Sequence, residues 1–289
     1  MAVWRRWVAC VISAALSIAM TDASRGGAPL RVMTSFYPMY IHTLNVVRGV
    51  PGVEVANLTP QVTGCLHDYQ LTPADLVRLT RADALIINGA GMESFTDRVA
   101  RQAPKIKIIQ ASEGIPLAGD GNPHVWVSIS LAIRQVQNIA AGLAALDPDH
   151  AAAYGANAAA YGKRLEELRA RMQENLKDIK RRDIITLHEA FPYFASEFGL
   201  RVVGVIEREP GSEPGAKELA AMIRMVRERG VKAIFTEPQY PRSAADAIAA
   251  ETGVKVYLLD PAVSGAMDAD AYVRAMEGNL RVLKEALGK

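Results

Sequence analysis

Three of the five histidines lie at the end of a predicted strand or in a loop that precedes a predicted helix. His188 directly follows the apolar run 184–187, His124 lies in a polar turn ahead of a predicted helix, and His67 lies in a loop between a strand and a helix. A single histidine is more often packed or exposed than a ligand. Because α/β sheets bind ligands outside the carboxyl ends of their strands, the three imidazoles together predict one shared cleft. Two others fall in helical patterns, where we expect packing or exposure: His42 and His150.

Two acidic residues are placed to join this cleft. Asp260 emerges from the last predicted strand, and three imidazoles with one carboxylate form a natural tetrahedral set for zinc. The set takes His67 and His124 from the first half of the chain, and His188 and Asp260 from the second. Glu237 ends another strand, where it would accept the second N–H of a ligand imidazole or act as an alternative ligand. We rank the supporting role of Glu237 first.

The elements that position these residues follow a repeated strand–helix order. Short β-branched runs predict buried strands, and longer runs with helical spacing predict helices. In the first half, the predicted strands are Arg31–Thr34, Val53–Leu58, Asp83–Asn88 and Lys105–Ile109, and the predicted helices are Tyr37–Arg48, Pro73–Thr80, Glu93–Gln102 and Ser130–Leu146. This alternation predicts a parallel sheet covered on both faces.

The second half has the same build after residue 180. Its predicted strands are Asp183–Leu187, Arg201–Ile206, Lys232–Thr236 and Val254–Leu259, and its predicted helices are Phe191–Phe198, Ala216–Arg229, Ser243–Thr252 and Ala269–Leu287. Gly230 and Gly253 sit just past two of these helices, where a left-handed cap favours a residue without Cβ. A second parallel sheet flanked by helices follows.

Between the halves, Asp149–Lys180 has no strand pattern and no proline, and it is rich in good helix formers. One helix of about 30 residues would run roughly 45 Å and cross the back of both halves. The predicted fold class is therefore α/β, with two lobes, each a parallel β-sheet flanked by helices, joined by a single long helix. We divide the chain into an N-terminal lobe over residues 24–148, a linker helix over 149–180 and a C-terminal lobe over 181–289. Such a helix predicts little hinge bending.

The first 23 residues read as a signal peptide for export. Arg5 and Arg6 precede a largely apolar run over residues 8–20, and small residues follow it. The run is shorter than the 18 or so apolar residues that span a bilayer as a helix, which argues against a retained anchor. The formal net charge of the chain is only +2, so nothing indicates a nucleic-acid or anionic-membrane partner. We expect a periplasmic or otherwise extracytoplasmic protein.

Six segments, in order and with matching spacing, resemble the zinc- and manganese-binding subunits of bacterial ABC importers, the ZnuA/TroA type. These segments are Thr34–Pro38, Pro60–Leu76, Ala82–Glu93, Asn122–Trp126, His188–Phe194 and Leu259–Pro261. The resemblance runs from about residue 30 to the C-terminus. It implies two lobes joined by one rigid helix, with a metal ion held between them and delivered to a membrane permease. It also implies a solute-binding protein, not an enzyme, and a monomer.

The ligand positions of this family fall on His67, His124, His188 and Asp260. The third position is His in zinc-type members and Glu in manganese-type members, so His188 favours Zn²⁺ over the alternatives Mn²⁺ and Fe²⁺. One departure is that residues 111–123 are short and lack the His-rich loop of many zinc-type relatives. Cys65, two residues before His67, could supply a thiolate, but we rank a buried, inert cysteine above that.

Two other functions remain open. The first is a zinc hydrolase, which could hold its metal with three histidines alone. Asp260 decides between hydrolase and transport protein, because a catalytic zinc keeps one open position while a transport site is closed by a fourth protein ligand. An adhesin role is the second, and the sequence has no motif for or against it. The Gly89–Gly91 turn is a poor match to a dinucleotide fingerprint, since Ser94 replaces its third glycine.

Overall fold

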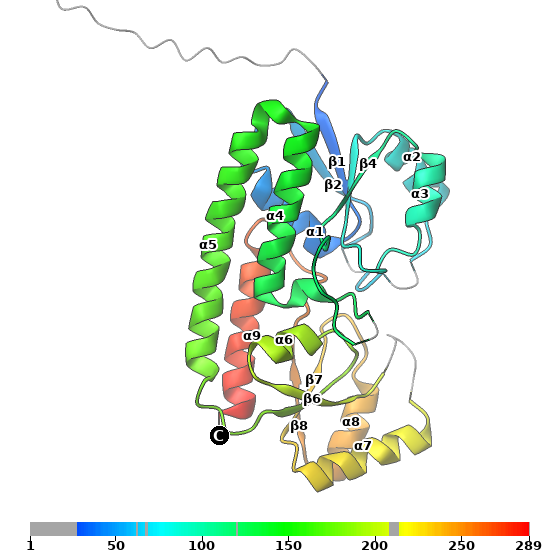
Figure 1. Ribbon diagram of the computed structural model, residues 1–289. Coiled ribbons are helices and arrows are strands. Elements are labelled where there is room, and N and C mark those ends of the chain that lie inside the picture. Colours follow the sequence, from blue (N-terminus) through cyan, green and yellow to red (C-terminus); the bar gives the residue numbers. More distant parts are fainter. Residues whose placement is uncertain (1–27, 62, 67–68, 120, 208–213, 289) are drawn as a thin grey trace, which may run out of the picture.

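The computed structural model of the chain describes residues 28–61, 63–66, 69–119, 121–207 and 214–288. The predicted signal peptide over residues 1–23 lies outside these residues, and so does His67. Two parallel four-stranded sheets lie at opposite ends of the molecule, and long helices run beside both (Figure 1). The predicted fold class is confirmed.

The first sheet has the strand order β2-β1-β3-β4, and every neighbouring pair is parallel. Its strands are β1 Leu30–Thr34, β2 Val53–Asn57, β3 Ala84–Ile87 and β4 Lys107–Gln110. The helices of this part are α1 Tyr37–Val46, α2 Pro73–Thr80, α3 Thr96–Gln102 and α4 Ile129–Leu146, with a short 3₁₀ turn, η1 Val125–Val127. All four residues of β3 are buried, as expected for a central strand covered on both faces.

The second sheet has the equivalent order β6-β5-β7-β8, again all parallel. Its strands are β5 Asp183–Thr186, β6 Arg201–Val205, β7 Ala233–Thr236 and β8 Lys255–Leu258. Its helices are α6 Pro192–Glu197, α7 Ala216–Arg229, α8 Ser243–Thr252 and α9 Ala271–Leu287. Gly230 and Gly253 end α7 and α8 in the left-handed conformation predicted for them.

The long helix α5, Ala151–Leu176, follows a 3₁₀ turn, η2 Pro148–His150, and is the linker predicted from the sequence. Its 26 residues make it about 39 Å long. It ends at Leu176, before the predicted end at Lys180. The cause is local: Ile179 is buried and its N–H bonds to Leu176 O, while the Arg182 guanidinium donates to Lys177 O. These hydrogen bonds satisfy carbonyl groups at the end of the helix, and the chain then leads into β5.

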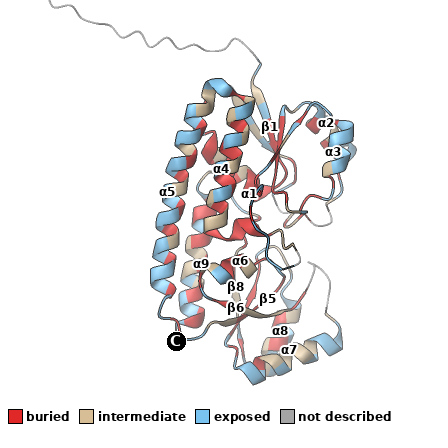
Figure 2. Cartoon of the chain, viewed as in Figure 1, coloured by how far each residue is buried: buried red, intermediate tan, exposed pale blue. Residues whose placement is uncertain are grey.

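One face of α5 is buried along its whole length. The buried side chains recur every three or four residues: Tyr154, Ala158, Tyr161, Leu165, Leu168, Met172 and Leu176. They face α4 and α9, and the outer side of α5 is exposed (Figure 2). The main hydrophobic core contains residues of both sheets, including Ile86 and Phe235. The largest hydrophobic cluster is therefore continuous between the two halves, and a smaller cluster that includes Ile185 and Ile234 lies in the second half.

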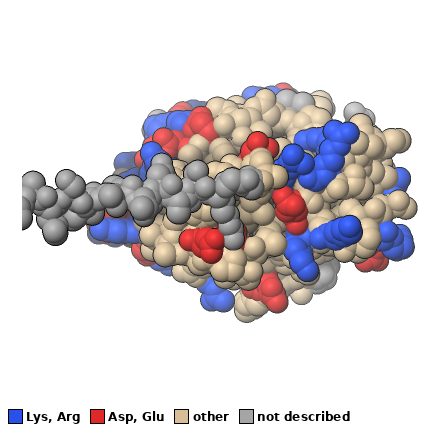
Figure 3. Space-filling view, turned by 90° about the horizontal axis from the view of Figure 1, so that it is seen from above, with Lys and Arg blue, Asp and Glu red and all other residues tan. Residues whose placement is uncertain are grey.

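Of the helices in the described part of the chain, α4 has the length and apolar composition that a membrane span also has. It nevertheless buries Ile129, Val136, Ile139 and Leu143 inside the protein, as the core helix of a folded domain does. Basic and acidic side chains are both spread over the face seen in Figure 3, in keeping with the small net charge.

One predicted boundary is wrong by three residues. Helix α3 begins at Thr96 and not at Glu93, because the Glu93 side chain is turned inward and is only 5% exposed. Its carboxylate accepts the N–H groups of Asn88 and Gly89 and the hydroxyl of Ser35. Burial raises the pKa of Glu93, and the three hydrogen bonds oppose that shift. The carboxylate therefore holds the loop after β3 in place through these hydrogen bonds.

Candidate metal centre

Two predicted site residues, His124 and His188, meet in the buried region between the two sheets. His188 follows β5 after one residue, and His124 immediately precedes η1. Their side chains are almost inaccessible, at 3% and 1% exposure respectively. The two Nε2 atoms lie 3.4 Å apart, and the rings meet edge to face. His124 and His188 therefore come together from separate halves of the chain, as the sequence predicted.

The tautomer of His188 is set by Glu237. Glu237 directly follows β7, and its Oε1 lies 2.5 Å from His188 Nδ1. Since the carboxylate can only accept, Nδ1 carries the proton and the Nε2 lone pair is directed toward His124 and Cys65. The other oxygen, Oε2, accepts the Gln239 side-chain amide at 2.9 Å. This is the contact that a carboxylate makes when it supports a metal-binding imidazole from behind.

The tautomer of His124 is set by Asn122. The Asn122 amide nitrogen donates to Glu189 O at 2.9 Å, which fixes the direction of the amide and turns its Oδ1 toward His124. That oxygen accepts the backbone N–H of His124 and lies 3.0 Å from its Nδ1. Nδ1 is therefore the protonated nitrogen, and the His124 Nε2 lies on the side of the ring that faces His188.

Two lone pairs at 3.4 Å repel each other when both rings are neutral. A cation that lies between them converts this repulsion into two coordinate bonds. The positions of Glu237 and Asn122 hold the rings in this arrangement in advance, so little reorganisation is needed for binding.

Cys65 is the third member of this cluster. Its Sγ lies 3.6 Å from His188 Nε2, and the ligand atoms of Cys65, His124 and His188 all lie within 4.8 Å of one another. Burial raises the pKa of the thiol, and the charge of Glu237 acts in the same direction. The spacing of residues gives no signal for this contact, because it depends on which way one loop side chain turns.

Among the described residues, Asp260 is not part of the cluster formed by Cys65, His124 and His188. It follows β8, and Asn279 of α9 holds its backbone through two bonds of 2.8 Å, one to the N–H and one to the carbonyl oxygen. Its Oδ1 accepts the Ala262 N–H at 2.7 Å. Burial raises the pKa of Asp260, and the nearby charge of Glu237 raises it further. A ligand role for Asp260 thus stays a prediction, and the same holds for His67, which is not among the described residues.

Buried polar contacts hold the loop that carries His124. Asn88, fixed at its own N–H by Glu93, donates from its side chain to Pro123 O at 3.0 Å. On the other side of the loop, the Trp126 indole donates to Pro261 O at 2.8 Å, which joins the first half to the segment after β8. The imidazole is therefore fixed by both halves of the chain.

Comparisons with known proteins identify the family of the chain. A model of the family described as "ZnuA: Zinc-uptake complex component A periplasmic" matches residues 32–286. The chain is 30% identical to the high-affinity zinc uptake system protein ZnuA of Bacillus subtilis, over 92% of this chain and 90% of that one. It is 28% identical to the zinc-binding lipoprotein AdcA of Streptococcus pneumoniae, over 93% of this chain but only 58% of the relative.

Among solved structures, the protein is similar to the solute-binding protein FpvC of Pseudomonas aeruginosa in complex with Mn²⁺. The TM-score is 0.82 at 34% sequence identity, and the match covers 90% of this chain and 98% of that one. The match of the family model over nearly the whole described chain, together with the ZnuA relative, places this protein in the ZnuA family of periplasmic zinc-uptake components.

Proposed function

We propose that this protein binds one divalent transition-metal ion, zinc by preference, outside the cytoplasm and delivers it to the permease of an ABC importer. The observation that carries the proposal is the pair of buried imidazoles whose Nε2 lone pairs face each other at 3.4 Å. The names of the relatives, a zinc uptake protein and a zinc-binding lipoprotein, support the choice of metal.

The proposed ligands are His124 and His188, with His67 and Asp260 as the predicted completing pair. In this proposal residues 1–23 direct export, residues 24–148 and 181–289 form the two lobes, and residues 149–180 connect them. The metal is the cargo and not a resident cofactor.

Zinc is preferred over manganese because imidazole nitrogen is a better donor to Zn²⁺ than to the harder Mn²⁺. The Mn²⁺ complex of FpvC keeps manganese, and with it Fe²⁺, as the alternative cargo. A direct competition between the two metals decides this point.

The hydrolase alternative needs a carboxylate that can take a proton from a metal-bound water. Among the described residues, Glu237 is the carboxylate that contacts the imidazole pair, through His188. Both of its oxygens are engaged, Oε1 with His188 and Oε2 with Gln239. This arrangement favours a supporting role over a general base, and therefore favours transport over hydrolysis.

Delivery requires that the metal leaves the space between the two halves. Contacts such as the bond from Trp126 to Pro261 and the bond from Tyr37 to Ala266 O close that space. We propose that docking on the permease separates these contacts, and that the protein docks as a monomer.

Growth of a strain that lacks this protein tests the transport role. Under zinc chelation, the wild-type gene should restore growth and the His188→Ala variant should not, at equal protein abundance. Restoration by manganese and not by zinc would reassign the cargo. Equal rescue by both genes would contradict the proposed function.

A further inference from the structure

We propose that Cys65 is a direct ligand, so that the cargo is held by a thiolate together with the two imidazoles. The inference rests on the proposed function, since it concerns the same cleft, and it assigns to that cleft a donor of a different chemical class. It replaces the interpretation of Cys65 as an inert residue.

The distances match a tetrahedral metal centre. With metal–sulfur bonds of about 2.3 Å and metal–nitrogen bonds of about 2.05 Å, a tetrahedron separates sulfur from nitrogen by about 3.5 Å and nitrogen from nitrogen by about 3.3 Å. In the protein, Cys65 Sγ lies 3.6 Å from His188 Nε2, and the two Nε2 atoms lie 3.4 Å apart. The third edge, from Cys65 Sγ to His124, is within 4.8 Å. Two of the three edges therefore already have tetrahedral lengths. With Cys65 as a ligand, one corner of the tetrahedron remains, for either His67 or Asp260.

The backbone next to Cys65 is built to hold the thiol there. The Cys65 N–H donates to the hydroxyl of Tyr240, which lies in the segment after β7 in the other half of the chain. Gly64 has φ +74°, and a Cβ at this position would lie 2.8 Å from the same hydroxyl. Since only glycine fits both the backbone angle and the space, the contact between the two halves sets the position of Cys65.

A thiolate changes which metals bind well. Binding replaces the S–H proton by the metal, so the thiol becomes a coordinated thiolate and one proton leaves to solvent. Sulfur is a soft donor that suits Zn²⁺ and binds Mn²⁺ poorly. The chain lacks a His-rich loop over residues 111–123, and Cys65 supplies another source of selectivity against harder metals.

Cobalt(II) spectroscopy tests the assignment, because a thiolate ligand gives Co²⁺ a near-ultraviolet charge-transfer band that nitrogen and oxygen ligands do not. The wild-type protein titrated with Co²⁺ should show this band together with the visible bands of a tetrahedral site. The Cys65→Ser variant should lose the near-ultraviolet band while it still binds Co²⁺. Thr63→Ala is the matched control, because its hydroxyl bonds only to Pro60 O in the same loop. It should behave as the wild type.

Two further measurements use zinc and manganese directly. Zinc should protect the Cys65 thiol from alkylation, and the difference between wild type and Cys65→Ser isolates this thiol from Cys10. The ratio of zinc to manganese affinity should fall by about tenfold or more in Cys65→Ser.

The outcomes separate the two proposals. Visible Co²⁺ bands without the charge-transfer band, with a thiol equally reactive in the presence of zinc, would overturn the role of Cys65 and leave the metal-binding function standing. Failure of the wild type to bind Co²⁺ or Zn²⁺ at all would overturn both.

Discussion

His188 shows how a single side chain acquires its function from its neighbours. Its Nδ1 is held by Glu237 and its Nε2 lies near both Cys65 and His124. The position of His188 after a strand and of His124 in a loop before a helix was enough to predict that they would converge, because ligands bind outside the carboxyl ends of the strands. The position of Glu237 after a strand was also enough to propose it as a support.

The same reasoning did not predict that the Cys65 side chain would lie beside His188, and the ligand role of Asp260 stays a prediction. Spacing along the chain does not encode the turn of a loop side chain, and the Cys65 contact depends on Gly64 and Tyr240. The backbone of Asp260 is held by Asn279 from a distant helix, a contact that no local pattern indicates.

The supporting carboxylate gives the first prediction. Glu237→Gln weakens the acceptor for His188 Nδ1–H and frees the ring to rotate, so zinc affinity should fall by about 10- to 100-fold. Competition with a chromophoric chelator measures the affinity. Glu54→Gln, the same change at an exposed position of β2, serves as the control and should leave the affinity unchanged. An unaltered affinity for Glu237→Gln would remove the supporting role.

His42 gives a prediction about acid stability. It is buried in α1 against Tyr161 and Tyr272, and burial lowers its pKa from 6.5 to about 3. The folded state therefore disfavours the protonated ring, so its stabilising contribution is complete above pH 6.5 and is lost as the pH falls toward 3.

In the wild type, His42 should reduce the free energy of unfolding by about 2 kcal/mol between pH 7 and pH 5. In the His42→Leu variant, whose side chain has a similar volume, the free energy of unfolding should fall by about 2 kcal/mol less over the same pH range. Urea denaturation of both proteins at the two pH values measures it. Equal losses in both proteins would mean that His42 does not titrate as proposed.

At the scale of elements, the strand and helix periods predicted the order of the elements and most of their positions. Boundaries differ where individual side chains make contacts that the helical period does not contain. Glu93 delays the start of α3, in part through a bond to Ser35, which lies far away along the chain. Ile179 and Arg182 bring α5 to an early end through bonds to carbonyl groups close by in the sequence.

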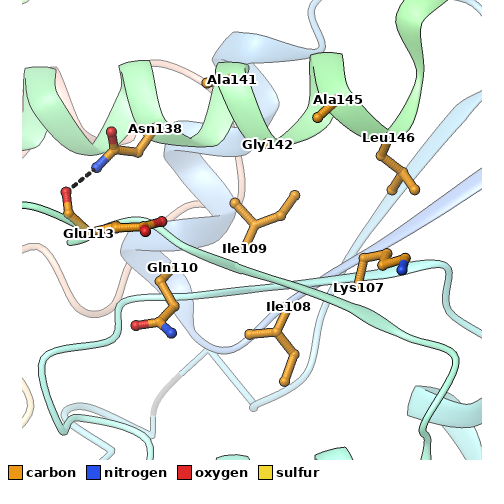
Figure 4. A pocket seen from close by; sticks show the side chains of 10 residues that line it. All are labelled: Lys107, Ile108, Ile109, Gln110, Glu113, Asn138, Ala141, Gly142, Ala145 and Leu146. Carbon is orange, nitrogen blue, oxygen red and sulfur yellow. Dashed lines mark hydrogen bonds between the residues drawn. The ribbon is translucent and has the colours of Figure 1, made fainter.

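The contact between α4 and β4 can be tested by one methyl group. Gly142 of α4 and Ile109 of β4 both line a pocket of about 480 Å³ (Figure 4). A Cβ at Gly142 would lie 2.6 Å from Ile109 Cγ2 and 2.9 Å from Cγ1. Gly142→Ala should therefore lower the free energy of unfolding by about 1–3 kcal/mol, although alanine favours helix.

A double-mutant cycle identifies the cause. Ile109→Ala removes the clashing atoms, so the two changes together should cost less than their sum, by about 0.5–3 kcal/mol. Chemical denaturation of the four proteins gives the coupling. Additive effects would show that the helix tolerates the methyl group by another route.

For the whole molecule, the shared core and α5 limit how the two halves can move. The buried face of α5 packs against α4 and α9 along its length, so large hinge bending would expose a continuous apolar stripe. We expect the radius of gyration measured by X-ray scattering to be the same with and without zinc, within experimental precision. A marked decrease on zinc addition would contradict a rigid linker and would indicate closure of two mobile lobes.

The most direct test of the central claim is the metal content and zinc affinity of the purified protein, compared with His188→Ala, Asp260→Ala and the Thr63→Ala control. We expect about one bound zinc per wild-type and Thr63→Ala chain, with binding sharply reduced in His188→Ala and, if Asp260 completes the site, in Asp260→Ala. A wild-type protein that neither carries nor takes up a divalent metal, or a His188→Ala variant that binds zinc as tightly as the wild type, would contradict it.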